Sequence, residues 1–202
     1  MKTKQTNKIK NRRVLVIAGP TGSGETTLTL EIIKKYPVFR RLVTATTRKP
    51  RGKDKNGVAY YFFSEKKFKN EIKKGNIIEY TYIKNRNVYY GSYKKDLDKK
   101  LKAGLNVIVN PDVVGAKYYK KKYNATAIFL MPDSMKNLRS RLIKRQPEIS
   151  KEELKRRLKN AKNEIKKEKK FYDFIVTNEE GKIRETADKI ISILKKEGYE
   201  LN

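Results

Sequence analysis

The sequence predicts an α/β protein with a three-layer core around a parallel sheet, a small inserted mixed lobe and a helical lid. Strand-like and helix-like segments alternate along most of the 202 residues, which is typical of a parallel sheet covered by helices. The segments 14–18, 106–110 and 126–131 have continuous apolar centres, as expected for strands buried on both faces. A glycine-rich loop at 19–24 directly follows the first of them. Together these observations predict one domain over residues 13–198.

The first helix is predicted over residues 27–36, where apolar side chains recur at helical spacing until Pro37, which cannot continue a helix. The inserted lobe follows at about 40–95. Its helix is predicted over 65–74, between a serine that can cap the N-terminus and a glycine that can end the helix. β-branched and aromatic residues predict the strands of the lobe, which are 41–47, 58–63, 77–83 and 87–90.

After the lobe, helix and strand patterns alternate up to the C-terminus. A highly charged helical stretch at about 133–170 is interrupted near Gln146-Pro147, because proline and the residue before it disfavour helix. We expect this stretch to form the lid. The remaining predicted elements of the core are, in order, helix 96–103, strand 106–110, helix 113–122, strand 126–131, strand 171–177 and helix 182–196.

Two residue types are absent from the chain, and their absence restricts its chemistry. Without cysteine it has no disulfide, zinc–thiolate site or thiol catalysis, which fits a cytoplasmic protein. Without histidine it has no Ser-His-Asp triad and no imidazole acid–base catalysis. The apolar run 14–18 is too short for a membrane span or a signal-peptide core, so we expect no membrane attachment.

The formal net charge of +29 allows two interpretations. Basic residues gathered in one block would indicate a nucleic-acid partner, but the lysines are spread over every helix-like segment. No RNA-binding aromatic signature is present either. We therefore expect a solvated basic surface without a nucleic-acid partner, and a disordered basic tail over residues 1–12. A polyanion-binding face stays open as the alternative.

A phosphate-binding motif with one unusual residue follows the first strand. It fits G-x-x-x-x-G-K-[ST] except that Glu25 stands at the lysine position. In such a loop, backbone N–H groups and the helix N-terminus bind a polyphosphate, and the final hydroxyl ligates Mg²⁺. Thr26 keeps this hydroxyl and is the candidate Mg²⁺ ligand. The predicted ATP-binding residues are Gly19, Pro20, Thr21, Gly22, Ser23, Gly24, Glu25, Thr26 and Thr27.

Seven further motifs follow this loop in a fixed order. They are 44–51, 57–62, 78–80, 89–92, 112–116, 141–157 and 172–178. In this order the motifs resemble the guanylate kinases, which transfer a phosphoryl group from ATP to GMP. The resemblance covers about residues 13–194 and is much more specific than a glycine-rich loop alone. It implies a P-loop fold, ATP and GMP as small-molecule ligands, and Mg²⁺ bound with ATP.

The resemblance implies that the lobe at 40–95 binds the phosphate of GMP. Arg48 and Arg51 would hold the phosphate, since guanidinium groups match its oxygens. Tyr60 and Tyr90 would add hydrogen bonds from their hydroxyl groups. For the two tyrosines, ordinary packing in a β-sheet stays open as the alternative.

The same resemblance implies that the lobe distinguishes guanine from adenine. Glu79 would accept hydrogen bonds from guanine N1–H and N2–H₂, a pair of donors that adenine lacks. Thr44 and Ser92 would complete the base contacts through their hydroxyls. Asp112 belongs to the same set and is also a candidate for positioning Mg²⁺ or a basic side chain. For Glu79, the alternative is a solvated charge on a strand.

Arginines of the charged stretch match those that this family brings onto the ATP phosphates. Arg141, Arg145 and Arg157, together with Arg48, are the candidate catalytic residues, since such groups stabilise charge that develops in the transition state. Relative to the family's pattern one residue is inserted before Arg156-Arg157, so either arginine of this pair can be the one that matches. The alternative for each of them is a solvated helix face.

Two residues depart from the family's pattern near the triphosphate. Glu25 is the first, and Asn110 is the second, because many relatives have an acidic residue there. The favoured function is a guanylate kinase with a changed nucleotide–metal site. The alternatives are a catalytically weak or inactive relative that binds GMP or acts as a scaffold, and a polyanion binder that has reused the fold. The sequence does not predict the oligomeric state.

Overall fold

The computed structural model describes residues 12–52 and 54–201. The basic tail predicted for 1–12 therefore lies outside the described residues, apart from Arg12. The larger sheet consists of five parallel strands, and the predicted α/β class with a parallel sheet is confirmed. In spatial order these strands are β2 (Phe39–Arg41), β7 (Asn106–Val109), β1 (Val14–Ala18), β8 (Thr126–Pro132) and β9 (Phe174–Asn178).

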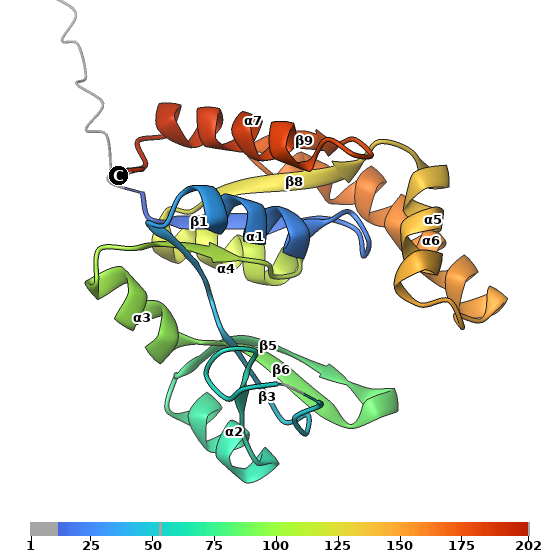
Figure 1. The fold of residues 1–202 in the computed structure, drawn as a ribbon. Coiled ribbons are helices and arrows are strands. Elements are labelled where there is room, and N and C mark those ends of the chain that lie inside the picture. The colour runs from blue at the N-terminus through green and yellow to red at the C-terminus, as the bar shows by residue number, and fades with distance from the viewer. Residues whose placement is uncertain (1–11, 53, 202) are drawn as a thin grey trace, which may run out of the picture.

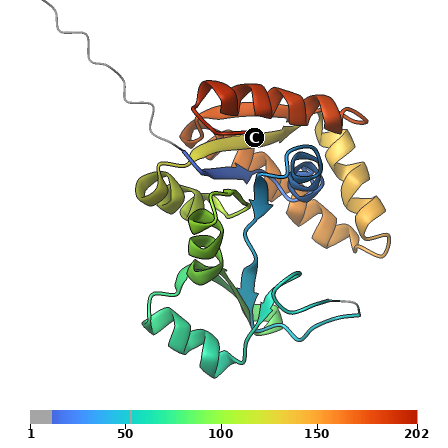
Figure 2. The same cartoon turned by 60° about the vertical axis from the view of Figure 1, so that its left-hand side comes forward.

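Helices cover both faces of this sheet (Figures 1 and 2). They are α1 (Glu25–Lys35), α7 (Ile183–Lys196), α3 (Lys94–Lys102) and α4 (Val113–Tyr123). Leu15 and Ile17 of β1 are buried in one hydrophobic cluster with α1 and α7. The intervening residues, Val14 and Val16, are buried in a second cluster with α3 and α4. Successive side chains of a strand point to opposite faces, so the sheet forms the middle of three layers.

A second, mixed sheet forms a lobe that lies below the core in Figure 1. Its strands, in spatial order, are β4 (Tyr61–Phe62), β3 (Thr44–Thr46), β6 (Val88–Tyr93) and β5 (Ile77–Ile83), with a 3₁₀ turn η1 (Lys84–Arg86) between the last two. Helix α2 (Glu65–Lys73) follows Ser64, whose hydroxyl accepts a hydrogen bond from the Lys67 N–H at 3.2 Å. The lobe has a core of its own, composed of Ala45, Phe63, Phe68 and Ile77.

Asp96 of α3 joins the lobe to the core. Its buried carboxylate accepts hydrogen bonds from the Val43 N–H at 2.9 Å and from the Tyr61 hydroxyl at 3.0 Å. It also forms an ion pair with Lys100, one turn further along α3. Asp96 thus binds both Val43, in the segment that enters the lobe, and Tyr61, in a strand of the lobe.

The charged stretch forms two helices, α5 (Met135–Arg145) and α6 (Lys151–Lys167), with the predicted interruption between them. Ser150 caps α6 by accepting a hydrogen bond from the Glu153 N–H at 3.2 Å. The helices pack around a small cluster separate from the main core, formed by Leu138, Leu142, Leu154 and Ala161. Among the described residues, no helix is both long and apolar enough to cross a membrane.

Several predicted strands differ from the structure in their bounds, and the strand predicted at 87–90 continues as β6 to Tyr93. The strand predicted at 41–47 is divided between the two sheets, since β2 ends at Arg41 and β3 begins at Thr44. The strand predicted at 58–63 is reduced to β4, because a turn with Gly57 at a φ of 76° occupies its first half. The last strand begins only at Phe174, after the short 3₁₀ helix η2 (Lys169–Phe171).

Candidate active site

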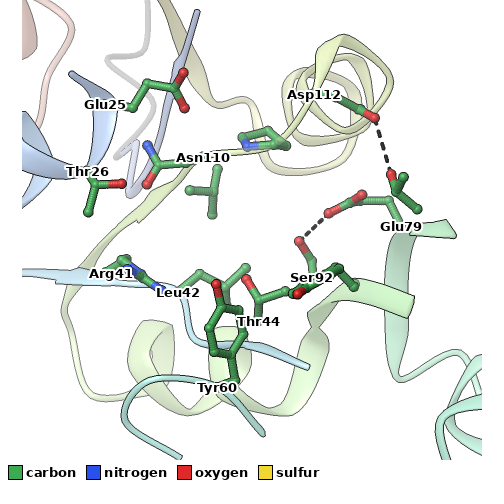
Figure 3. Close-up of a pocket in the computed structure, with 15 residues that line it drawn as sticks. Glu25, Thr26, Arg41, Leu42, Thr44, Tyr60, Glu79, Ser92, Asn110 and Asp112 are labelled. Carbon is green, nitrogen blue, oxygen red and sulfur yellow. Dashed lines mark hydrogen bonds between the residues drawn. The ribbon is translucent and has the colours of Figure 1, made fainter. Parts of the chain in front are cut away.

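A cavity of about 320 Å³ lies between the lobe and the core (Figure 3). It opens at the carboxyl ends of β1 and β7, the edge of a parallel sheet where ligands usually bind. Both sheets contribute residues to its wall. The lobe and the segment leading to it contribute Leu42, Thr44, Tyr60, Glu79, Thr81, Tyr90, Gly91 and Ser92, and the core contributes Glu25, Thr26, Arg41, Val109, Asn110, Pro111 and Asp112.

Glu79 and Ser92 form a hydrogen-bonded pair at the lobe end of the cavity (Figure 3). The Ser92 hydroxyl donates to Glu79 Oε1 at 2.5 Å. Glu79 lies where the register of β5 against β6 shifts, and such an irregularity can redirect a side chain. Burial raises the pKa of Glu79, and the nearby Asp112 raises it further, while the hydrogen bond from Ser92 opposes both effects. Thr44 lies opposite Ser92 in the sheet, so three predicted base-contacting residues are neighbours.

Helix α4 lies close to the side chain of Glu79. A Cβ atom at Gly115 would be 3.3 Å from both Cγ and Cδ of Glu79, and only 2.6 Å from the Cβ of Pro111. Any larger residue would therefore push against the carboxylate. Asp112 caps this helix, because its Oδ1 accepts a hydrogen bond from the Gly115 N–H at 2.9 Å.

The predicted phosphate ligands lie in two different settings. The rings of Tyr60 and Tyr90, which both line the cavity, meet edge to face with centroids 5.7 Å apart. The Arg48 guanidinium lies over the Tyr60 ring at 5.2 Å and pairs with Asp54 at 2.8 Å. This ion pair raises the pKa of Arg48 and lowers that of Asp54. Arg48 is therefore beside the cavity rather than in its wall.

Arg51 lies outside the wall of the cavity, on an exposed turn. Its backbone N–H donates to Asp54 at 3.0 Å, so one aspartate holds the backbone of Arg51 and the side chain of Arg48. The role predicted for Arg51 stays a prediction. Sequence reasoning missed Asp54, and it also missed Arg41, whose place in a predicted strand gave no sign that it would line the cavity.

The glycine-rich loop at 19–24 connects β1 with α1, as the motif predicted. Gly24 has a φ of 104°, and a Cβ atom there would be 2.4 Å from Asn178 Nδ2. The buried Asn178 side chain donates to the Ser23 carbonyl at 2.7 Å. Only a glycine tolerates both the positive φ and the close approach of Asn178 at this position. Asn178 thus holds the loop from β9, and no motif in the loop itself indicated this contact.

A second cavity, of about 600 Å³, lies on the outer side of the loop. Its wall consists of Thr21, Gly22, Gly24, Glu25, Thr26, Thr27, Arg141 and Arg145. Arg141 donates to the carbonyls of Ser23 at 3.3 Å and Asn178 at 3.1 Å, and its Nε donates to Glu180 at 2.7 Å. Two of the predicted lid arginines therefore face the loop.

Arg157, the third predicted lid arginine, is held on its own helix. Its Nε donates to Glu153 at 2.7 Å. Arg156 donates to the same carboxylate at 2.8 Å from its own Nε. Neither arginine lines the two cavities, so the choice between them stays open.

Glu25 lies in the walls of both cavities, as the first residue of α1. Burial raises the pKa of this half-buried carboxyl to about 8, and the Glu164 carboxylate acts in the same direction. The Ser23 hydroxyl, at 3.4 Å from Oε1, and the charge of Arg145 oppose the rise. At pH 7 the Glu25 carboxyl is therefore mostly protonated and neutral, which differs from the carboxylate that the sequence suggested.

The oxygen atoms near the loop suit Mg²⁺ that arrives with a nucleotide. Mg²⁺ is usually bound by one or two protein oxygen ligands together with substrate phosphates and water. Thr26 lines both cavities, and Asp112 lines the first. The described residues contain no group of three or more acidic, histidine or cysteine side chains that would hold a metal alone. Asn110 also lines the first cavity; its Nδ2 donates to the Ile17 carbonyl at 2.9 Å, and its Oδ1 accepts from the Thr29 hydroxyl at 3.4 Å.

Comparisons with known proteins identify the family of the chain. The family model described as guanylate kinase matches residues 11–197. A guanylate kinase of Helicobacter pylori is 37% identical over 183 residues, which span 90% of this chain and 86% of the relative. A guanylate kinase of Malacoplasma penetrans is 37% identical over 191 residues, with 93% and 94% covered. The crystal structure of guanylate kinase from Anaplasma phagocytophilum superposes with a TM-score of 0.68 at 29% identity, covering 93% of this chain and 87% of that one. The chain belongs to the guanylate kinase family and is a nucleoside monophosphate kinase.

Proposed function

We propose that this kinase transfers the γ-phosphoryl group of ATP to GMP. The observation that carries the proposal is the first cavity, which has the Glu79–Ser92 pair in its lobe wall and Thr26 of the phosphate-binding loop in its core wall. A base-reading carboxylate and a triphosphate-binding loop at one cavity suit an acceptor nucleotide that meets a donor. Phosphoryl transfer depends mainly on such positioning and on charge stabilisation.

On the acceptor side, guanine would donate N1–H and N2–H₂ to Glu79. The phosphate of GMP would lie near Tyr60 and Tyr90, within reach of the Arg48 guanidinium that stacks on Tyr60. Arg41 is an additional cation in the cavity wall. Arg51 remains a candidate second phosphate ligand from the neighbouring turn.

On the donor side, backbone N–H groups of the loop 19–24 would bind the ATP phosphates, as the helix N-terminus favours anions. Arg141 and Arg145 would stabilise the charge that develops during transfer. We propose that α5 and α6 act as a lid, because they form a unit with its own apolar cluster. Mg²⁺ would neutralise phosphate charge when bound with ATP, and Thr26 is the residue placed to ligate it.

The second candidate is a catalytically weak relative that retains GMP binding. Glu25 favours it, since a glutamate cannot supply the positive charge that the lysine of the motif brings to the β- and γ-phosphates. A coupled assay with ATP, Mg²⁺ and GMP separates the two candidates. Calorimetric binding of GMP without turnover would support the weak relative, and absence of GMP binding would contradict both.

Protonation of Glu25 gives this enzyme an expected pH dependence. Because the pKa of Glu25 is raised to about 8, the carboxyl is neutral below pH 8 and becomes negative as the pH rises through that value. A negative Glu25 repels the ATP phosphates, so KM for ATP should rise above pH 8. Glu164, whose own pKa burial raises to about 7, and Arg145 are the other charged groups that act on Glu25.

The measurement is KM for ATP between pH 7 and pH 9.5 in the wild type and in Glu25→Gln. The variant keeps the shape of the side chain but carries no titrating proton, so it also corrects for titration of ATP and of Glu164. We expect the two curves to separate above pH 8. Parallel curves over the whole range would show that Glu25 does not change its charge near the nucleotide.

A further inference from the structure

Arg41 is the one basic residue in the wall of the first cavity, among the residues that the structure describes. The same wall contains three acidic side chains, Glu25, Glu79 and Asp112. A phosphate group carries a charge of about −1.5 to −2 at pH 7, so a phosphate site is favoured by a cation that can donate hydrogen bonds. The position of Arg41 therefore indicates where in this cavity an anion can bind.

The Arg41 guanidinium has no carboxylate partner within residues 12–52 and 54–201. Its Nη2 donates to the Ala59 carbonyl at 3.5 Å, which is long for such a hydrogen bond. The Asp96 carboxylate, on the neighbouring helix α3, pairs with Lys100 instead. Burial lowers the pKa of Lys100 and the charge of Arg41 acts in the same direction, so a second cation is close by. An anion in the cavity would meet a guanidinium with donors that the described part of the chain does not use.

Arg41 lies at the end of the cavity that the acceptor phosphate would occupy. Ala59, whose carbonyl it contacts, directly precedes Tyr60 in the chain, and Tyr60 is a candidate phosphate ligand in the same wall. Glu79, the candidate base-reading residue, lies on the opposite side of the cavity (Figure 3). A nucleotide with its base at Glu79 would thus direct its phosphate toward Tyr60 and Arg41.

Arg41 differs in two respects from Arg48 and Arg51, the arginines that the sequence motif indicated. Arg48 pairs with Asp54 at 2.8 Å, so a phosphate would have to compete with this carboxylate, whereas Arg41 has no such competitor. Arg41 is also the last residue of β2 and belongs to the core, and only Leu42-Val43 separate it from β3 of the lobe. A phosphate bound by Arg41 and by lobe residues would therefore be held from both sides of this connection.

We propose that Arg41 binds the phosphate of the acceptor nucleotide from the core side of the cavity, opposite the ligands that the lobe contributes. This inference rests on the proposed function. The planar guanidinium can donate two parallel hydrogen bonds to phosphate oxygens, and its charge offsets the repulsion between the phosphate and the carboxyls of the wall. A nucleoside without a phosphate gains nothing from Arg41, so this residue favours nucleotides over nucleosides.

The test is the affinity of the full chain for GMP and for guanosine, measured by calorimetry in the wild type, Arg41→Gln and Arg41→Lys. Arg41→Gln should raise Kd for GMP about 10- to 100-fold, as expected for a hydrogen bond between charged groups, and should leave Kd for guanosine and KM for ATP unchanged. Arg41→Lys keeps the charge without the planar pair of donors, so its Kd for GMP should be intermediate. Arg40→Gln is the matched control, because it removes the same charge from an exposed neighbour that does not line the cavity.

Each other outcome overturns a defined part of this account. If Arg41→Gln weakens the binding of guanosine as much as that of GMP, the guanidinium does not act on the phosphate. If Arg40→Gln has the same effect as Arg41→Gln, the loss reflects the overall charge of the chain. A wild type that fails to bind GMP contradicts both the proposed function and the inference. A wild type that binds GMP while Arg41→Gln binds it equally well contradicts the inference alone.

Discussion

Replacement of Glu25 by lysine is expected to raise kcat/KM for ATP by roughly 100- to 1000-fold at pH 7. A lysine at this position would be within a few ångströms of the β- and γ-phosphates. One such charge pair at about 4 Å, with an effective dielectric constant of about 20, contributes about 4 kcal/mol. Because Glu25 is mostly neutral at this pH, the gain comes mainly from the added attraction. At pH 9 it should be larger, since the wild-type side chain is then negative and repels the nucleotide.

The measurement is kcat/KM for ATP at matched Mg²⁺ and ionic strength in the wild type, Glu25→Lys and Glu25→Gln. The glutamine variant separates charge from size, and at pH 7 we expect it to resemble the wild type. A wild-type enzyme that already turns over at about tens per second, with no gain in Glu25→Lys, would show that the loop obtains its cation elsewhere. Arg145, which faces the loop, would be the first residue to consider.

Replacement of Glu79 by glutamine is expected to weaken GMP binding roughly 100-fold, since hydrogen bonds to a charged acceptor are stronger than neutral ones and an unmatched donor is costly. Glutamine has one acceptor oxygen, and its NH₂ group would face the guanine donors. The loss should be specific to guanine, because a site built for hydrogen bonds discriminates against ligands that lack them. AMP binding, already weak, should change little.

Calorimetry with GMP and AMP on both proteins tests this expectation. Glu65→Gln is the matched control, because Glu65 lies on the surface of the same lobe and pairs only with the neighbouring Lys69 among the contacts described. Equal affinities of the wild type for GMP and AMP would remove Glu79 as the base-reading residue. They would also contradict the proposal that this lobe binds GMP.

The parts of the fold that the sequence predicted are those encoded by local patterns. Residues 14–18 form a continuous apolar run, and such a run suffices to predict a strand that is buried on both faces. Ser64 caps its helix by accepting a hydrogen bond from the N–H of Lys67, which is only three residues further along the chain. Hydrogen bonds of this kind depend on neighbours in the chain, so they can be read before the tertiary structure is known.

The parts that the sequence did not predict depend on contacts between distant residues. Asp54 lies in a segment with no periodic pattern, and it pairs with Arg48, which lies beside the cavity rather than in its wall. The charge state of Glu25 was also beyond the sequence, because it is set by burial and by Glu164 on a helix far along the chain.

The core, the lobe and the α5–α6 unit have hydrophobic clusters of their own, and this separation has a mechanical consequence. The main core, the lobe and the α5–α6 unit each bury their own apolar residues, so we expect that each part can rotate as a rigid body without repacking its interior. The required changes in backbone dihedral angles then fall on short connections, such as Leu42-Val43 between β2 and β3. Asp96 accepts a hydrogen bond from the Val43 N–H and therefore holds the connection between β2 and β3. A nucleotide that contacts both the core and the lobe would fix the angle between these two parts.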